Sequence, residues 1–232
     1  GGLAVADILS GKVNPSGKLP MTFPVSYLDI PSSANFPYNY KKTQTGDWDF
    51  LWGGKKKEQK CIDYTEYDEG IYVGYRYFQT AGAPVSYPFG YGKSYTTFEY
   101  SKPVVKATAD GFTATITVKN TGSVAGKESV QLYVAAPAGG LEKPAFELKG
   151  FAKTKELAPG ESQTLTIDVC RYTLASFNEA NSAWETAAGT YKVMFGANAA
   201  DIRGTAEYKL KKAESWKTNN VLAPENPINE LS

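Results

Sequence analysis

The second half of the chain alternates apolar and polar side chains in short runs. In Phe112–Val118 apolar residues alternate with threonines, and the same period of two appears in Val130–Val134 and Leu165–Val169. This period is typical of a half-buried β-strand, because successive side chains point to opposite faces of a sheet. Further strands are expected within 97–107, 146–155, 190–196 and 203–210. About seven or eight short strands over this length predict a two-sheet sandwich of the immunoglobulin or fibronectin type III kind. The Cys…Trp…Cys pattern of antibody domains is missing, which favours the fibronectin-like variant.

The beginning of the chain has a different pattern. Apolar residues at positions 3, 5, 8 and 9 suit a helix packed on one side, and Gly11 fits the position just after its end. Leu19–Phe23, closed by Pro24, predicts a short strand. A lone helix and strand cannot bury two faces, so we expect this stretch to be the tail of an α/β domain whose body lies upstream.

The remaining segments carry little periodic signal. Residues 25–66 are loop-like, and Gly70–Phe78 fits a short helix or a strand without a decision between them. Pro84–Ser94 is rich in turn residues, and the last stretch of the chain is polar. We therefore predict a mainly β protein divided into an α/β remnant (1–36), a long loop and linker (37–95), a β-sandwich (96–210) and a C-terminal tail (211–232).

Composition narrows the chemistry. The net charge of +1 gives no electrostatic footprint for nucleic acid or for an anionic membrane, and no apolar run approaches the length of a membrane span. The first residues lack the pattern of a signal peptide, and the upstream part expected above would carry any such segment. Histidine is absent, which removes Ser-His-Asp and Cys-His catalysis and His-ligated zinc. The two cysteines, Cys61 and Cys170, are too few for a four-ligand zinc site; separate thiols are the favoured reading, with a single bridge as the alternative.

Carboxylates and tryptophans are the remaining candidates for a site. Glu66, Asp68 and Glu69 cluster in the sequence, and paired carboxylates can cleave a glycosidic bond, but a solvated acidic loop explains this cluster better. Trp48 and Trp52 could stack on a sugar ring, or could simply anchor a long loop to its own domain.

Two further features have plainer interpretations. Trp184 lies beside a strand pattern and is expected in core or sheet-face packing. The sequence Gly90-Tyr91-Gly92 lacks the spacing of a phosphate-binding loop. The residues themselves therefore assign no active site.

Several stretches in fixed order resemble the C-terminal part of family 3 glycoside hydrolases, the β-glucosidase group. The first stretch, Gly1–Pro24, resembles the end of the family's α/β sandwich domain. Two further stretches, Glu69–Phe78 and Pro88–Tyr100, resemble the link to the family's third domain. The remaining stretches resemble the family's fibronectin-like domain: Glu147–Phe151 with Leu157–Ser162, and Ala188–Ala197 with Asp201–Arg203.

The resemblance implies hydrolysis of terminal β-glucosides with retention of configuration, by one carboxylate as nucleophile and a second as acid and base. In the family these are an Asp on an N-terminal barrel and a Glu in the α/β domain, and neither motif has a matching position here. The resemblance therefore implies a non-catalytic piece of a larger enzyme, with no catalytic residue, metal or cofactor of its own. A substrate-rim role is expected for Trp48 or Trp52.

The partners implied are the upstream barrel and α/β domains and a β-glucoside or oligosaccharide, with no nucleic acid and no membrane, in a secreted or periplasmic enzyme. The alternatives are a carbohydrate-binding sandwich, a purely structural spacer and, within the family, a β-xylosidase.

Overall fold

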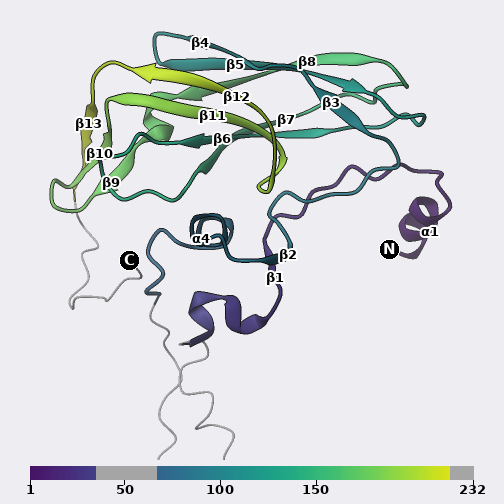
Figure 1. Ribbon diagram of the computed structural model, residues 1–232, viewed down its shortest axis with the longest axis horizontal. Helices are drawn as coiled ribbons and strands as arrows, with labels where there is room; N and C mark the ends of the chain where they lie inside the picture. The colour runs from purple at the N-terminus through teal and green to yellow at the C-terminus, as the bar shows by residue number, and fades with distance from the viewer. Residues whose placement is uncertain (35–66, 220–232) are drawn as a thin grey trace, which may run out of the picture.

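Two four-stranded antiparallel sheets form the body of the protein (Figure 1). The computed structural model describes residues 1–34 and 67–219. In one sheet the central strand β5 (Gly111–Asn120) pairs with β8 (Ser162–Cys170) on one side and with β3 (Phe98–Tyr100) and β4 (Val104–Ala107) on the other. The second sheet has the order β12-β11-β6-β7, made of Asp201–Leu210, Gly189–Asn198, Ser129–Ala135 and Glu147–Lys153.

The alternating residues that predicted the strands build the core between the sheets. From β5, Phe112, Ala114, Ile116 and Val118 are at most 2% exposed, while the intervening threonines lie nearer the surface. They pack with inward residues of the opposite sheet, including Leu132, Val193 and Phe195. The predicted mainly β fold and all the strands expected between residues 97 and 210 are confirmed.

A third, smaller sheet has the order β13-β10-β9 and lies at the end of the sandwich remote from α1 (Figure 1). It consists of β9 (Ser176–Asn178), β10 (Ala183–Thr186) and β13 (Glu214–Lys217), and a 3₁₀ turn, η3 (Arg171–Leu174), precedes it. These three strands were not predicted, because strands of three or four residues are too short to show a clear period of two.

The N-terminal segment contains the predicted helix, α1 (Gly2–Leu9), followed by Gly11 at φ +76°. The strand expected at Leu19–Phe23 is wrong in extent, because β1 contains only Phe23–Pro24 and pairs with β2 (Val85–Tyr87). Leu19 instead exchanges backbone hydrogen bonds with the turn after β2, donating to Tyr91 O (2.8 Å) and accepting from Gly90 N (2.9 Å). Two 3₁₀ turns follow, η1 (Tyr27–Asp29) and η2 (Pro31–Ala34).

The ambiguous stretch 70–78 leads into a helix, α4 (Tyr75–Ala81), which ends at the left-handed Gly82 (φ +63°). Helix α4 lies against the outer face of the β12-β11-β6-β7 sheet, on the same side as β1 and β2 (Figure 1). Within the described ranges no helix is long and apolar enough to cross a membrane.

Candidate functional site

Aromatic stacking fixes helix α4 to the sandwich. The Tyr75 ring stacks on Phe89 at 4.7 Å and contacts Tyr133 and Phe146 at 6.0 and 6.3 Å between centroids. The Tyr75 hydroxyl also accepts a hydrogen bond from Leu148 N at 2.8 Å. This packing fixes the start of α4 against the β12-β11-β6-β7 sheet.

Polar contacts hold the same region to the connection between β6 and β7. The Tyr72 hydroxyl donates to Glu142 Oε1 at 2.6 Å, and this hydrogen bond raises the pKa of Tyr72. Glu147 pairs with Arg76 of α4 at 3.2 Å and with Lys149 at 3.0 Å. The residues on either side of the start of α4 are therefore anchored to one edge of the sandwich.

The predicted site residues are only partly described. Trp48, Trp52, Glu66 and Cys61 lie outside the described ranges. Glu69 begins a turn closed by a hydrogen bond from Tyr72 N (2.9 Å) and is only 7% exposed, so the solvated acidic loop expected around it is wrong at this residue.

Two other singled-out residues lie in the sandwich. The sheet-face packing expected of Trp184 is confirmed: it lies on β10, against Phe177 and Tyr172 and outside the core. Cys170 is an exposed thiol at the end of β8.

A buried ion pair joins the N-terminal segment to the sandwich, and the sequence did not reveal it. Lys18 Nζ lies 3.1 Å from Glu128 Oε1 and donates to Ala197 O at 3.1 Å. The Tyr100 hydroxyl donates to the same Glu128 oxygen at 2.8 Å. The Lys18 and Glu128 side chains are 17% and 7% exposed. Burial, with the neighbouring Glu128 charge, raises the pKa of Tyr100 far above its usual value, so this hydroxyl stays a donor.

Asn14 and Gln131 tie further segments into the same junction. Asn14 Nδ2 donates to Ala125 O at 2.8 Å, and its Oδ1 accepts from Tyr95 N at 2.8 Å. Gln131 Nε2 donates to Gly90 O and to Ala197 O, both at 3.1 Å. Four segments far apart in sequence are therefore joined by polar contacts, most of them buried or part-buried, which fix the N-terminal segment on the sandwich.

An open groove of about 590 Å³ runs beside this junction. Phe23 and Tyr87, which lie across the β1–β2 pair, are 42% and 46% exposed along it, and Tyr91 packs against Tyr87 at 5.2 Å. The groove is lined by Gly17, Lys18, Leu19, Phe23, Tyr87, Tyr91, Gly92 and Lys93. Its walls are mainly apolar and aromatic, which is the character of a surface that packs against other protein.

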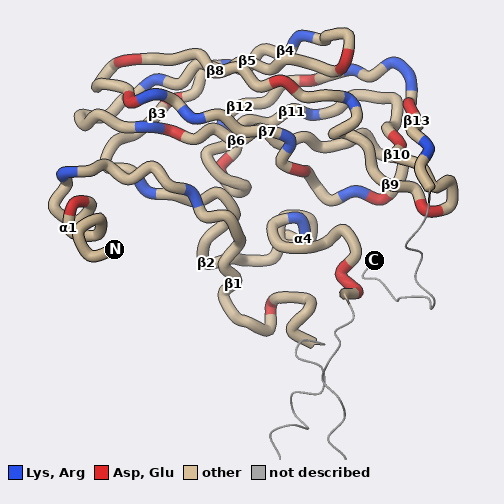
Figure 2. The backbone as a smooth tube through the Cα atoms, turned by 180° about the vertical axis from the view of Figure 1, so that it is seen from behind, with Lys and Arg blue, Asp and Glu red and all other residues tan. Residues whose placement is uncertain are grey.

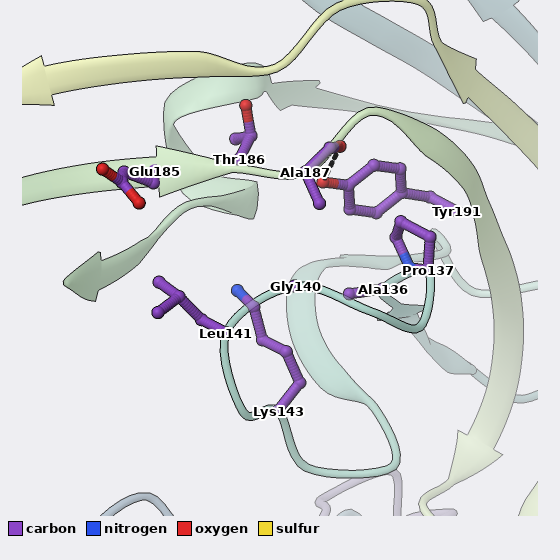
Figure 3. Close-up of a pocket in the computed structure, with 9 residues that line it drawn as sticks. All are labelled: Ala136, Pro137, Gly140, Leu141, Lys143, Glu185, Thr186, Ala187 and Tyr191. Atoms are coloured by element: carbon purple, nitrogen blue, oxygen red, sulfur yellow. Dashed lines mark hydrogen bonds between the residues drawn. The ribbon is translucent and has the colours of Figure 1, made fainter.

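A smaller cleft of about 90 Å³ lies between the β6–β7 connection and the end of β10 (Figure 3). Its polar groups are engaged within the chain: Tyr191 donates to Ala187 O at 2.8 Å, and Lys143 Nζ donates to Leu174 O at 3.3 Å. Burial lowers the pKa of Lys143. Glu185 accepts hydrogen bonds from Asn178 and Asn181, both at 2.8 Å. No predicted site residue lines this cleft, and its size and satisfied groups give it no evident chemistry.

Charge is spread evenly over the backbone, with Lys and Arg interspersed with Asp and Glu (Figure 2). Within the described residues no group of three or more Cys, Asp or Glu side chains is placed to hold a metal ion.

Comparisons with known proteins match the two parts of the chain separately. Residues 1–75 match the glycosyl hydrolase family 3 C-terminal domain, and residues 128–199 match the fibronectin type III-like domain. Probable beta-glucosidase K of Emericella nidulans is 40% identical over 93% of the chain and 23% of its own length. Beta-glucosidase A of Butyrivibrio fibrisolvens is 42% identical over 88% of the chain and 24% of its own length.

Solved structures agree with these matches. Beta-glucosidase 3B of Thermotoga neapolitana, in complex with α-D-glucose, has a TM-score of 0.79 and 40% identity over 94% of the chain and 27% of its own. A beta-glucosidase from Paenibacillus barengoltzii has a TM-score of 0.80 and 37% identity over 97% of the chain and 24% of its own. The chain thus spans about a quarter of the length of the proteins it resembles.

Proposed function

The chain belongs to glycoside hydrolase family 3, as its C-terminal part, and we propose that it serves a retaining β-glucosidase as the segment that stabilises and orients the catalytic domains. The matched relatives are β-glucosidases about four times as long as the chain. In this proposal the enzyme removes terminal β-D-glucosyl residues, and the 232-residue chain alone has no activity. Members of the family are often exported from the cell, so the proposed enzyme is secreted or periplasmic.

Retention needs two carboxylates about 5 Å apart, one forming a glycosyl–enzyme intermediate and the other acting first as acid and then as base. Both are proposed to lie on parts of the enzyme outside this chain. The role of the chain is then mechanical: a rigid sandwich that holds the α/β remnant in one position.

The exposed apolar surface of the N-terminal segment carries this proposal. Leu3, Leu9 and Leu28 are 85%, 78% and 78% exposed, and the groove at Phe23 and Tyr87 continues the same apolar character. The sandwich, in contrast, has a closed core. Apolar side chains exposed to this extent are characteristic of an interaction surface, and the catalytic domains of the same enzyme are the proposed cover.

Trp48 and Trp52 are proposed to reach the rim of the active site. The flat apolar face of an indole ring, which can stack on a sugar ring, supports this role. In the full-length enzyme, Trp48→Ala with Trp52→Ala should raise KM or lower kcat/KM, while Phe151→Ala, at a side chain 73% exposed on β7, should leave both unchanged. Unchanged kinetics in the double variant would remove these tryptophans from the site.

Hydrolysis of a chromogenic β-glucoside tests the main proposal. The 232-residue chain should give no turnover, and the full-length enzyme should hydrolyse the β-glucoside faster than the matching β-xyloside. Turnover by the chain alone, with its purity confirmed by intact mass, would overturn the assignment of catalysis to other domains. Preference for the xyloside would replace β-glucosidase by β-xylosidase, the runner-up within the family.

A further inference from the structure

Four aromatic rings form a continuous row on the small third sheet. Successive ring centroids lie 5.6 Å apart from Phe177 to Trp184, 5.9 Å from Trp184 to Tyr172, and 5.3 Å from Tyr172 to Trp216. No step in the row exceeds 6 Å. These rings therefore make one connected aromatic surface, which we call the aromatic row.

Strand register places three of the rings on one face. Trp184 lies directly opposite Phe177 of β9 and directly opposite Trp216 of β13. Residues directly opposite one another in antiparallel strands point to the same face of the sheet. Tyr172 comes from η3 and contacts both tryptophans, filling the space between them.

The aromatic row is open to solvent rather than part of the core. Tyr172 is 46% exposed and Trp184 is 37% exposed, Phe177 and Trp216 are half-buried, and none of the four residues belongs to the cluster between the main sheets. The third sheet lies at the end of the sandwich remote from α1 (Figure 1), and none of its residues lines the groove at β1 and β2. The row is thus separate from the surface assigned above to the catalytic domains.

The charges beside the row are largely satisfied within the chain. Arg171 Nε lies 3.2 Å from Glu214 Oε1, on the strand that carries Trp216. Glu185, which follows Trp184, points to the opposite face of the sheet and lines the cleft of Figure 3. An aromatic surface bordered by the Arg171–Glu214 ion pair has no free cationic group described at its edge for a phosphate or a polyion; it suits a neutral ligand that has apolar faces and a polar edge.

We propose that the aromatic row binds a β-linked gluco-oligosaccharide. A pyranose ring presents C–H groups on its faces and hydroxyls around its edge, which matches an indole or phenol ring with apolar face and polar tip. The two most exposed rings, Tyr172 and Trp184, lie 5.9 Å apart and can contact neighbouring sugar units. The choice of a glucan rests on the proposed function, but the binding itself needs no catalytic domain.

Isothermal titration of the 232-residue chain with cellohexaose tests the proposal. The titration is repeated with Tyr172→Ala, Trp184→Ala, Trp48→Ala/Trp52→Ala and Phe151→Ala, each checked for thermal unfolding. Phe151 is the matched control, an aromatic side chain 73% exposed on β7 of the same sandwich. Heteronuclear NMR of the indole N–H groups locates the binding.

Binding is expected in the unsubstituted chain, with Tyr172→Ala and Trp184→Ala each weakening it about fivefold or more. Phe151→Ala should change the Kd by less than about twofold. The indole signals of Trp184 and Trp216 should shift during the titration. Tyr172→Ala keeps the test decisive if Trp184→Ala fails to fold.

Absence of binding, or equal loss with Phe151→Ala, would overturn the aromatic row as a saccharide site. Loss confined to the Trp48/Trp52 variant would place binding elsewhere and would also overturn it. These results are separable from the proposed function, because the full-length enzyme can hydrolyse a β-glucoside whether or not the row binds a glucan, and the row can bind even if that activity is absent.

Discussion

Removing the Lys18 ammonium tests how strongly the N-terminal segment is fixed to the sandwich. Lys18→Met keeps the length and much of the apolar stem of the side chain but removes the charge that faces Glu128. Glu128, at 7% exposed, would keep the hydrogen bond from Tyr100 at 2.8 Å and lose its counter-ion at 3.1 Å. Removing one partner of a buried pair typically costs about 3–5 kcal/mol. We expect the lower end of that range, about 3 kcal/mol, because Tyr100 still donates to the carboxylate.

A double-mutant cycle isolates the contribution of the pair. The free energy of unfolding in urea is measured for the unsubstituted chain, Lys18→Met, Glu128→Gln and the double variant. The double variant should be less destabilised than the sum of the two single variants, by about 1 kcal/mol or more, because no unpaired buried charge remains. Lys12→Met is the matched control: Lys12 lies 3.1 Å from Asp7 but is 74% exposed. This change should cost no more than about 0.5 kcal/mol.

Equal effects of Lys18→Met and Lys12→Met would refute the reasoning. That result would mean that water reaches Glu128 easily, and that the junction is not held by a desolvated ion pair. Strict additivity in the cycle would carry the same conclusion.

Three further changes have definite expected outcomes. Gly90→Ala should lower the free energy of unfolding by about 2–4 kcal/mol, because φ is +78° and a Cβ would overlap the buried Gln131 amide. Gly160→Ala is the control: φ is +81° but the position faces open space, so the loss should be only about 1–2 kcal/mol. Thermal unfolding of the two variants compares these losses. Asn120→Ala should lower the free energy of unfolding in urea by about 3 kcal/mol. The fully buried amide donates to two carbonyl oxygens and accepts from a hydroxyl and a backbone N–H, and all four groups would lose their partner. A loss under about 1 kcal/mol would mean that water replaces the amide. Burial lowers the pKa of Lys143 below 10.5, so the unfolded chain binds more protons than the folded chain at pH values between the folded-state pKa and 10.5. The free energy of unfolding, measured relative to Lys143→Met, should therefore rise with pH across that window. A difference that does not change with pH would show that Lys143 is well hydrated.

The sandwich was predictable because its strands are long enough to show a period of two. Phe112–Val118 alternates over a full strand, and its apolar members became the core. Strand β13, by contrast, is four residues long, and it owes its place to pairing with β10, which no local pattern records. The aromatic row escaped prediction for the same reason: Tyr172, Trp184 and Trp216 are separated in sequence and meet only through register.

The junction was hidden for a different reason. Lys18 and Glu128 are unremarkable charged residues in the sequence, and only the fold brings them within 3.1 Å and excludes water. Trp48 and Trp52 stay predictions, because they lie outside the described residues. Long-range polar contacts depend on tertiary structure, which periodicity and composition do not encode.

The junction also has a consequence for the order of folding. Lys18 bonds Glu128 across 110 residues and Ala197 across 179, and Asn14 bonds Ala125 across 111. A ribosome releases the N-terminal segment before the sandwich, so the segment must wait through the synthesis of nearly the whole sandwich before its last partner exists. Contacts this distant are formed late, because chain entropy opposes them until local structure has shortened the loop. The Lys18–Ala197 hydrogen bond therefore forms only after β11 has been synthesised, and a nascent chain stopped before Ala197 would leave Lys18 without its carbonyl partner.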